Sequence, residues 1–241
     1  MAPTLIPLHD TARRIGEPVG LSALLGSMLP YGVAFAGGRL DHPNPTRFEV
    51  EETAIARASE SRRQEFIAGR SYARTALAAL GCQACPIPVN SDRRPVWPDG
   101  YIGSISHTRC LCAAIAARND DYHGLGIDVE TEAGLEPELQ RIILRPEERS
   151  RATISRTSER DLAKLVFVAK EAVFKAYYPA TSTFLDFPDV LVEFDPSCQR
   201  FRARLTADHA PGLAGRRCFE GRIGWAEAHV VAVVAIARAA R

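Results

Sequence analysis

A helical pattern that occurs twice, 101 residues apart, constrains the fold of this chain more than any other feature. Residues 61–80 carry apolar side chains at helical spacing, and Gly81 is placed to end that helix. A second helix is expected over residues 161–178, where Pro179 would end it. The two segments align without a gap, with phenylalanine on phenylalanine and basic residues on basic residues at two further positions. This pattern predicts that one structural unit is built twice.

A strand-like run follows each of these helices after a stretch punctuated by prolines. In the first copy Ser106 and His107 lead into an apolar run over residues 113–117, and in the second copy His229 leads into residues 230–237. The spacing from helix to strand differs between the copies. The repeat is therefore interpreted as a diverged duplication.

The predicted fold class is α+β, a pseudodimer of two similar α+β halves over residues 1–120 and 121–241. Halves related by a pseudo-twofold axis would bring their matching helices and strands to a shared cleft. Chance similarity between two alanine-rich helices is the alternative. A length of 241 residues suits either two domains of ordinary size or one larger domain.

The overall charge and the lengths of the apolar runs exclude several classes of protein. A formal net charge of +1 argues against a general nucleic-acid binder, so electrostatic recognition must come from local patches. The longest apolar run, residues 230–237, is far shorter than a membrane span. Residues 1–20 carry prolines and charged side chains where a signal peptide needs an unbroken apolar stretch. We therefore expect a cytoplasmic protein that binds neither nucleic acid nor membrane.

The six cysteines do not form the pattern of a structural zinc site. Cys82 and Cys85 have CxxC spacing, but no second CxxC or HxxxH follows at the distance that a zinc finger needs. Cys110 and Cys112 lie in an apolar, strand-like run. Reduced cysteines, some of them buried as small apolar residues, are expected, with a metal or redox role as the alternative.

Charged residues lie on one stripe of each predicted helix, because positions i, i+7 and i+11 share a helix face. The stripe of the first helix is wholly basic and that of the second helix is mixed. The two sets are Arg63, Arg70 and Arg74, and Lys164, Glu171 and Lys175. A solvated helix face is the commonest fate of such a stripe, but the planar fork of arginine binds two phosphate oxygens at once. The basic stripe is therefore a candidate phosphate site.

A group of carboxylates forms a second candidate site in the sequence. Asp128 and Glu130 alternate with apolar residues in a predicted strand, so their side chains share one face. Glu171 and Lys175 share a helix face and can project towards that strand. Three crowded carboxylates repel one another unless a cation lies between them, and oxygen ligands favour Mg²⁺, Mn²⁺ or Ca²⁺. A simple ion pair between Glu171 and Lys175 within the helix is the alternative.

Two further segments offer phosphate contacts. Residues 92–100 form a loop held extended by prolines, and this loop carries Arg93. Residues 103–107 place small residues and His107 where a strand is expected to begin. A lone histidine is more often structural, but beside arginines and a cation site His107 is interpreted as a phosphate donor. The chain has neither a GxSxG elbow nor a GxxxxGK[ST] loop, which argues against serine hydrolases and P-loop enzymes.

Five short motifs, spread over about residues 60–180, occur in the order and at the spacing typical of one family. They are Arg62-Arg63-x-x-Phe66-x-x-Gly69-Arg70-x-x-x-Arg74, Arg94-Pro95-x-Trp97-Pro98, Gly103-Ser104-Ile105-Ser106-His107, Gly126-Ile127-Asp128-Val129-Glu130 and Lys170-Glu171-x-x-x-Lys175. In these motifs the chain resembles the 4'-phosphopantetheinyl transferases of the surfactin and enterobactin synthetase type. The resemblance implies a pseudodimer that binds coenzyme A in the cleft between its halves.

The resemblance also implies roles for particular residues. Mg²⁺, or Mn²⁺ in its place, would be held on the pyrophosphate of coenzyme A by Asp128, Glu130 and Glu171. Coenzyme A itself would be bound by Arg63, Arg70, Arg74, Arg93, Ser106, His107 and Lys175. Arg93 departs from the family, in which lysine is common near this point, so either Arg93 or Arg94 would reach the ligand. Glu148 matches a further acidic position, and the first 45 residues carry no motif that transfers.

The implied reaction moves 4'-phosphopantetheine from coenzyme A to a serine of an apo acyl or peptidyl carrier protein and releases 3',5'-ADP. Glu171, Lys175 and His107 would be the catalytic residues: Glu171 accepts the serine proton directly or through water, and Lys175 offsets charge on the leaving side. A monomer with internal pseudo-twofold symmetry is expected.

The sequence leaves the carrier and its pathway open. Fatty-acid, polyketide, nonribosomal-peptide and siderophore pathways all use such carriers, and residues 141–160 are the candidate docking region. Two alternative functions stay open. One is a different Mg²⁺-dependent enzyme that acts on a nucleotide pyrophosphate, and the other is a non-catalytic protein that binds coenzyme A or a carrier.

Overall fold

The computed structural model describes residues 20–40, 48–155, 159–195, 197 and 199–239. The helices are α2 (Leu21–Met28), α3 (Glu49–Ala54), α4 (Glu60–Ala79), α5 (Pro137–Ile143), α6 (Pro146–Ser155) and α7 (Glu159–Thr181), with a short 3-10 helix η1 (Phe187–Asp189). The strands are β1 (Ala34–Arg39), β2 (Tyr101–His107), β3 (Leu111–Arg118), β4 (Tyr122–Thr131), β5 (Val190–Phe194), β6 (Arg200–Leu205), β7 (Cys218–Ala226) and β8 (His229–Ala237).

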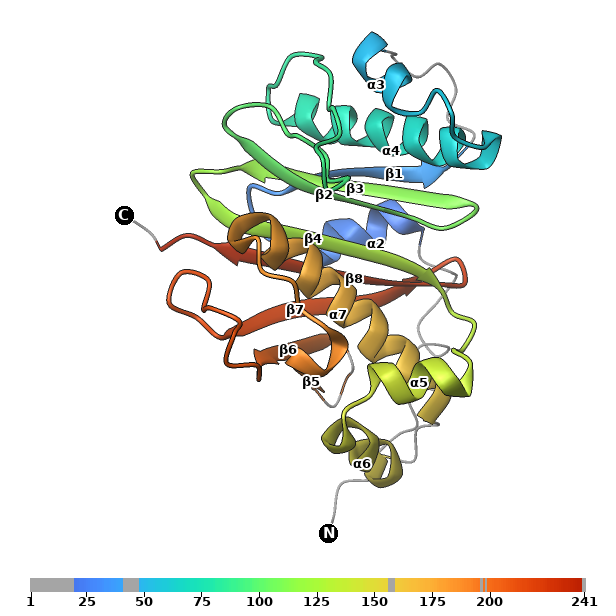
Figure 1. Cartoon of the computed structure of the whole chain (residues 1–241), viewed down its shortest axis with the longest axis vertical. Coiled ribbons are helices and arrows are strands. Elements are labelled where there is room, and N and C mark those ends of the chain that lie inside the picture. Colours follow the sequence, from blue (N-terminus) through green and yellow to red (C-terminus); the bar gives the residue numbers. More distant parts are fainter. Residues whose placement is uncertain (1–19, 41–47, 156–158, 196, 198, 240–241) are drawn as a thin grey trace.

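The strands form two antiparallel sheets, one before residue 120 and one after it. The first has the order β1-β3-β2 and the second has the order β4-β8-β7-β6-β5. In Figure 1, α4 lies along the smaller sheet and α7 crosses the larger one. Each half is thus a long helix on an antiparallel sheet, which confirms the predicted α+β fold of two similar halves. The proposed domain limits, 1–120 and 121–241, stay a prediction.

The two long helices form where the repeat predicts them, but one predicted end is wrong. α4 begins after Ser59, whose hydroxyl accepts a hydrogen bond from the Arg62 backbone N–H, and it stops before Gly81, which has a φ of +82°. α7 does not stop before Pro179, because that proline lies within the last turn, where its missing N–H costs only one hydrogen bond. The helix ends instead before Ser182, which adopts a left-handed φ of 53°.

The strand prediction is correct for the second copy of the repeat and partly wrong for the first. β8 runs from His229 to Ala237, as expected. The segment around Ser106 does not begin a strand that continues over residues 113–117. It lies inside β2, which ends at His107, and a tight hairpin leads into β3 at Leu111. His107 is therefore at the end of a strand, next to a turn.

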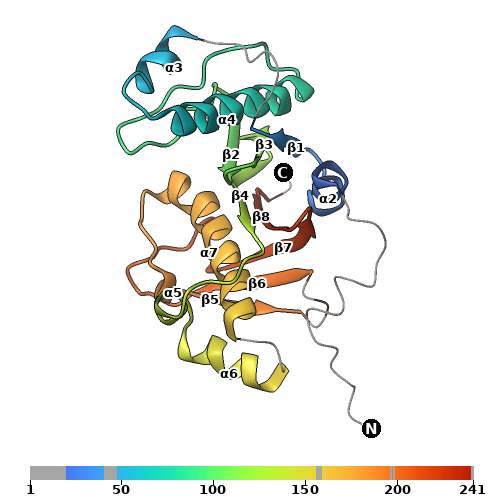
Figure 2. The same ribbon diagram turned by 90° about the vertical axis from the view of Figure 1, so that its right-hand side faces the viewer.

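The strands at the centre of the molecule are covered on both faces. Along β3, Cys112 and Ala114 pack towards α4, whereas Ala113 and Ile115 belong to a separate core with α2. Along β8, alternate residues likewise divide between the α7 core and the α2 core. Figure 2 shows α2 on one side of the strands and α7 on the other. α2 packs against both sheets and so helps to hold the halves together.

The two sheets are joined along β2 and β4 by serine side chains. Ser104 Oγ accepts a hydrogen bond from the Ile127 N–H at 3.1 Å, and Ser106 Oγ accepts one from the Val129 N–H at 3.2 Å. Hydroxyls of one half thus satisfy backbone donors of the other, which would otherwise be buried without partners. The hydrogen bonds at this junction give a structural explanation for the serines of the 103–107 motif.

Glycines in β4 allow α7 to approach the strand closely. A Cβ added to Gly126 would lie 1.9 Å from the Ala172 carbonyl oxygen, and one added to Gly124 would lie 2.1 Å from that of Ala176. Asp128 follows two residues after Gly126 on the same face of the strand. The close packing therefore brings Asp128 next to the charged residues of α7.

Two other expectations can be compared with the described residues. Among those residues no helix is both long and apolar enough to cross a membrane. The five described cysteines are free, in agreement with reduced cysteines, and Cys198 lies outside the described residues. Cys112 is buried in β3 as expected, whereas Cys110 lies in the exposed turn before that strand.

Candidate functional site

A lysine, an aspartate and a serine from three different elements meet at the junction of the halves. Lys175 Nζ on α7 donates to Asp128 Oδ1 on β4 at 2.7 Å and to Ser106 Oγ on β2 at 3.0 Å. Ser106 Oγ in turn donates to Asp128 Oδ1 at 3.0 Å. Asp128 is only 4 % exposed, so its charge depends on these partners. The predicted neighbourhood of Lys175 and Asp128 is confirmed.

Two further predicted acids lie around this contact. Glu130 Oε2 is 3.4 Å from Lys164 Nζ, a buried lysine whose position matches Arg63 in the first helix of the repeat. Burial and the Asp128 carboxylate raise the pKa of Glu130, against the opposing effect of Lys164. Burial and the same Asp128 carboxylate raise the pKa of Glu171, while Lys175 opposes the rise. The three carboxylates therefore repel one another as the sequence analysis expected.

The chemistry of these acids fits a hard divalent cation. Asp128 Oδ2 is buried and has no hydrogen-bond partner, and Glu130 and Glu171 are both destabilised as anions by their surroundings. A bound Mg²⁺ would satisfy the free oxygen and relieve the repulsion. In the part of the chain that the structure describes, no three His, Cys, Asp or Glu side chains converge at metal-binding distance. The assignment of Asp128, Glu130 and Glu171 as metal ligands therefore stays a proposal.

His107 lies beside an arginine that the sequence analysis did not assign to the site. Its Nε2 is 3.0 Å from Arg62 Nη1 and 3.8 Å from Glu65 Oε2, both on α4. Burial lowers the pKa of His107, and the Arg62 and Lys175 charges lower it further, whereas Glu65 raises it. Because a guanidinium can only donate, His107 Nε2 accepts this hydrogen bond. Arg62 belongs to the first family motif, but the sequence analysis gave it no role.

The basic stripe of α4 faces protein groups. Arg74 forms a buried ion pair with Glu51 on α3 at 2.7 Å, and Arg63 lies 3.3 Å from Glu52 of the same helix. Arg70 donates from Nε to the Ile87 carbonyl at 2.7 Å, and burial lowers its pKa to about 10. These contacts make at least part of the stripe structural. Its predicted role in binding coenzyme A stays a prediction.

A cavity of about 700 Å³ lies between the halves and includes Lys175 in its lining. The loop with Arg93 and Arg94 and strand β2 line it from the first half, and β4 and the end of α7 line it from the second. Arg94 pairs with Asp92 at 2.8 Å and lies over the ring of Tyr178 on α7, 4.8 Å from its centroid. Arg93 and Arg94 both line the cavity, so both can meet a ligand there. Arg70 and Arg74 are not among its lining residues.

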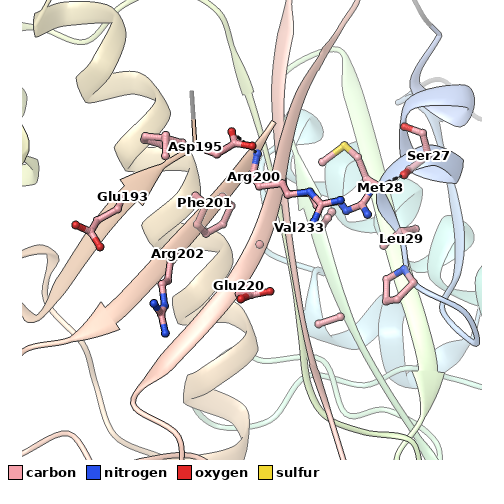
Figure 3. Close-up of a pocket in the computed structure, with 15 residues that line it drawn as sticks. Ser27, Met28, Leu29, Glu193, Asp195, Arg200, Phe201, Arg202, Glu220 and Val233 are labelled. Carbon is pink, nitrogen blue, oxygen red and sulfur yellow. Dashed lines mark hydrogen bonds between the residues drawn. The ribbon is translucent and has the colours of Figure 1, made fainter. Parts of the chain in front are cut away.

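A second cavity, of about 570 Å³, lies between the end of α2 and the face of the larger sheet. Figure 3 shows Arg200, Arg202 and Glu220 around it, with Met28 and Leu29 from the α2 side. None of its lining residues belongs to the carboxylate site. The second cavity therefore lies apart from the contact of Lys175, Asp128 and Ser106, whereas the first includes Lys175 in its lining.

Glu148 and Lys170 form a buried pair that is structural. Glu148 Oε2 is 2.9 Å from Lys170 Nζ, and its carboxylate also accepts hydrogen bonds from the Arg145 and Val192 backbone N–H groups. Lys170 donates as well to the carbonyls of Ile143 and Phe187. This network holds α6, α7 and β5 together. It explains an acidic residue at position 148 without a contact to a ligand.

The chain is similar to known proteins over most of its length. Residues 50–117 match the family model of the 4'-phosphopantetheinyl transferase N-terminal domain, and residues 124–234 match that of the 4'-phosphopantetheinyl transferase superfamily. The 4'-phosphopantetheinyl transferase Svp of Streptomyces mobaraensis is 37 % identical over 221 residues, which cover 90 % of this chain and 89 % of Svp.

Two further relatives carry the same description. The 4'-phosphopantetheinyl transferase PptT of Mycobacterium tuberculosis is 33 % identical over 196 residues, which cover 78 % of this chain and 86 % of PptT. The 4'-phosphopantetheinyl transferase Npt of Nocardia iowensis is 36 % identical over 174 residues, which cover 71 % of this chain and 77 % of Npt. The region matched by the first family model includes Ser106, and the region matched by the second includes Asp128 and Lys175.

Proposed function

Because this chain belongs to the 4'-phosphopantetheinyl transferase superfamily, we propose that it transfers 4'-phosphopantetheine from coenzyme A to a serine of an apo acyl or peptidyl carrier protein, with release of 3',5'-ADP. The observation that carries the proposal is the contact of Lys175, Asp128 and Ser106. It joins both halves at one point, beside a cavity that also draws on both. A site of this kind suits a substrate held between the halves.

Mg²⁺, or Mn²⁺, would be held by Asp128, Glu130 and Glu171 and would neutralise charge on the pyrophosphate of coenzyme A. The buried, unpartnered Asp128 Oδ2 and the raised pKa values of both glutamates support this ligand set. Transfer of a phosphoryl-type group from one oxygen atom to another needs alignment and charge neutralisation more than covalent help from the protein.

Glu171 would accept the proton of the carrier serine, directly or through water. Burial and Asp128 raise the pKa of Glu171, which makes its carboxylate a better proton acceptor than an exposed one. The serine oxygen would then form a bond to the β-phosphorus of coenzyme A, and the bond from that phosphorus to the departing 3',5'-ADP oxygen would break. Lys175 would offset the negative charge on the leaving side, because its ammonium lies at the junction in contact with Asp128 and Ser106.

Coenzyme A would occupy the cavity that Lys175 lines and extend towards the basic residues of the first half. Arg93 and Arg94 at the cavity wall, Ser106 at the junction and His107 beside Arg62 support this placement. Arg63, Arg70 and Arg74 would contribute positive charge behind them, although each also has a protein partner. Arginines that already contact carbonyls or carboxylates keep further donors for phosphate.

The carrier would dock near the start of the 141–160 region. Leu139 and Ile142 on α5 are 46 % and 58 % exposed and flank Arg141, which gives an apolar surface beside a positive charge. Such a surface suits an acidic carrier that presents its serine. A cytoplasmic location, a monomeric state with internal pseudo-twofold symmetry and the pathway of the carrier stay predictions.

Incubation of the full chain with coenzyme A, Mg²⁺ and a panel of apo carrier proteins tests the proposal by intact-protein mass spectrometry. We expect one carrier to gain the mass of phosphopantetheine and 3',5'-ADP to appear in equal amount. Hydrolysis of coenzyme A without a carrier adduct would identify a nucleotide-pyrophosphate hydrolase instead. Binding of coenzyme A with neither product would identify a non-catalytic binding protein.

A further inference from the structure

A cysteine, a threonine and a histidine form a separate cluster where the hairpin of the first half meets the second half. Thr108 and Cys110 lie in the turn between β2 and β3, and His229 begins β8. His229 Nε2 is 3.5 Å from Cys110 Sγ and 3.3 Å from Thr108 Oγ1. The transferase mechanism uses none of these three side chains. The cluster therefore needs its own explanation.

The hydrogen bonds of His229 determine which ring nitrogen carries the proton. His229 Nδ1 lies 2.8 Å from the Glu227 carbonyl oxygen, which can only accept. Nδ1 is therefore the donor, and Nε2 of the neutral ring presents its lone pair to the thiol and the hydroxyl. A nucleophile next to a base that a third group orients is the arrangement that activates serine and cysteine nucleophiles.

The turn holds the thiol in place while leaving it accessible. Thr108 Oγ1 accepts hydrogen bonds from the Leu111 N–H at 3.1 Å and the Cys110 N–H at 3.4 Å, which fixes the turn. Cys110 is exposed, whereas His229 is only 7 % exposed. A reagent in solution can therefore reach the sulfur while the base stays shielded from bulk water.

Three of the other described cysteines, Cys82, Cys85 and Cys112, have a different environment. Cys112 is buried, and burial raises its pKa to about 12. Burial and the neighbouring Cys82 raise the pKa of Cys85, and the Cys82 thiol donates to the Gln83 carbonyl, which is not a base. Since the thiolate is the nucleophile, these thiols serve as internal standards for Cys110.

We propose that Cys110 is a site of thiol–disulfide exchange with low-molecular-weight disulfides, with His229 as its base. His229 Nε2 takes the thiol proton, and the Cys110 sulfur attacks one sulfur of the disulfide. The disulfide bond breaks, one half stays on Cys110 as a mixed disulfide, and the other half leaves as a thiolate. The proton on His229 passes to water, or to the leaving thiolate where that thiolate is basic enough to take it. No further oxidant is needed, because the incoming disulfide is itself the oxidised reactant. The site is independent of the proposed transferase function.

The reduced full chain with a limiting amount of 5,5'-dithiobis(2-nitrobenzoate) tests this proposal. Released thiolate gives the overall rate by absorbance, and peptide mass spectrometry gives the rate at each cysteine. We expect the Cys110 peptide to react at least about tenfold faster than those of Cys82, Cys85 and Cys218. The Cys110→Ser variant should lose the fast phase of thiolate release. A fast phase that persists in that variant overturns the proposal.

The role of His229 is tested by His229→Asn, which keeps a donor near the Glu227 carbonyl but removes the base. We expect the rate at Cys110 to fall at least about tenfold while those of Cys82 and Cys85 stay unchanged. His209→Asn, on an exposed histidine outside the cluster, is the matched control and should change none of these rates. An unchanged Cys110 rate in His229→Asn overturns the assignment of the base. A rise in Cys112 labelling would reveal that His229→Asn unfolds. In that case the Cys110→Ser result and the order of thiol reaction rates in the wild type decide whether the proposal holds.

Discussion

Lys175 Nζ on α7 lies 2.7 Å from Asp128 Oδ1 on β4, although Glu171 stands four residues before Lys175 on the same helix. Helix spacing alone would pair Lys175 with Glu171. Asp128 is the partner because it is more deeply buried, so its anion is more costly to leave alone, and because Ser106 accepts from the same ammonium. Burial and Asp128 raise the pKa of Glu171 next to this contact, which suits its proposed role as a proton acceptor.

Replacing Glu171 with alanine should abolish transfer and leave coenzyme A binding measurable. The change removes the proposed proton acceptor and one proposed metal ligand but no phosphate contact, so kcat should fall by at least about 100-fold. A carrier-loading assay and calorimetry with coenzyme A measure the two effects. Glu220→Ala, an exposed glutamate on β7 away from the site, is the control and should behave as wild type. Near-normal turnover of Glu171→Ala would contradict the assignment of Glu171 as proton acceptor and metal ligand.

Lys175→Met should lower kcat by about 100-fold or more, because it removes the cation that offsets charge in the transition state. It also leaves Asp128 without its ammonium, so the variant should unfold at a lower temperature. Lys175→Arg keeps the charge with a different shape and should recover most of the stability but little of the rate. Carrier loading and thermal unfolding check both variants. Equal rates for Lys175→Met and wild type would contradict the proposed role of Lys175 in offsetting charge in the transition state.

The pH dependence of stability should reveal the raised pKa of Glu171. The folded metal-free protein holds this proton more tightly than the unfolded chain does, so the stabilisation is complete below the ordinary value of 4.5. It is lost as the pH rises through the folded pKa. Glu171→Gln cannot ionise, so without Mg²⁺ it should be more stable than wild type near neutral pH and similar to it at low pH. Urea unfolding across pH measures the difference, and a difference that does not vary with pH contradicts the shift.

Gly126→Ala should be among the most damaging single changes outside the charged residues. The added Cβ would lie 1.9 Å from the Ala172 carbonyl oxygen, so α7 has to move away from β4 and takes Lys175 with it. We expect a loss of about 3 kcal/mol or more of unfolding free energy, together with a large loss of transfer. Gly20→Ala, which has open space around it, should change stability by less than about 1 kcal/mol. Thermal unfolding and carrier loading compare the two variants.

Loss of Arg70 and loss of Arg74 should differ in their effects on coenzyme A binding and on stability. Arg74→Ala leaves the buried Glu51 carboxylate without its ion-pair partner at 2.7 Å, which should cost about 3–5 kcal/mol of stability. Arg70→Ala should mainly weaken coenzyme A binding, with a smaller effect on stability from the lost Ile87 contact. Urea unfolding and calorimetry distinguish the two outcomes. Unchanged coenzyme A affinity in Arg70→Ala would assign that arginine to the fold alone.

Local periodicity predicted which residues share a face, and these predictions are correct. Alternation along β4 places Asp128 and Glu130 on the side of Gly126, and helical spacing gives α4 and α7 their charged stripes. The repeat also predicted two similar halves. The prediction that the second helix ends before Pro179 is wrong for a local reason, since a proline in the last turn of a helix removes only one hydrogen bond.

Contacts between elements could not be predicted in the same way. The sequence did not indicate that Arg62 would lie beside His107, that Lys164 would reach Glu130, or that Arg74 would pair with Glu51. Each of these contacts joins residues that are more than twenty positions apart in the chain. Which of several equivalent charges becomes a partner depends on how two elements pack, and a single sequence contains no direct record of that packing.

The sequence by itself therefore determined the elements, their apolar and charged faces and the residue types gathered on each face, because these follow from backbone periodicity. The tertiary structure decided which faces meet. β4 meets α7 at the distance that Gly124 and Gly126 permit, so Lys175 binds Asp128 within the second half, and Ser106 of the first half contacts both. The physical reason is burial: a buried carboxylate takes the nearest available cation, and only the packing of α7 and β2 against β4 determines which carboxylate is buried.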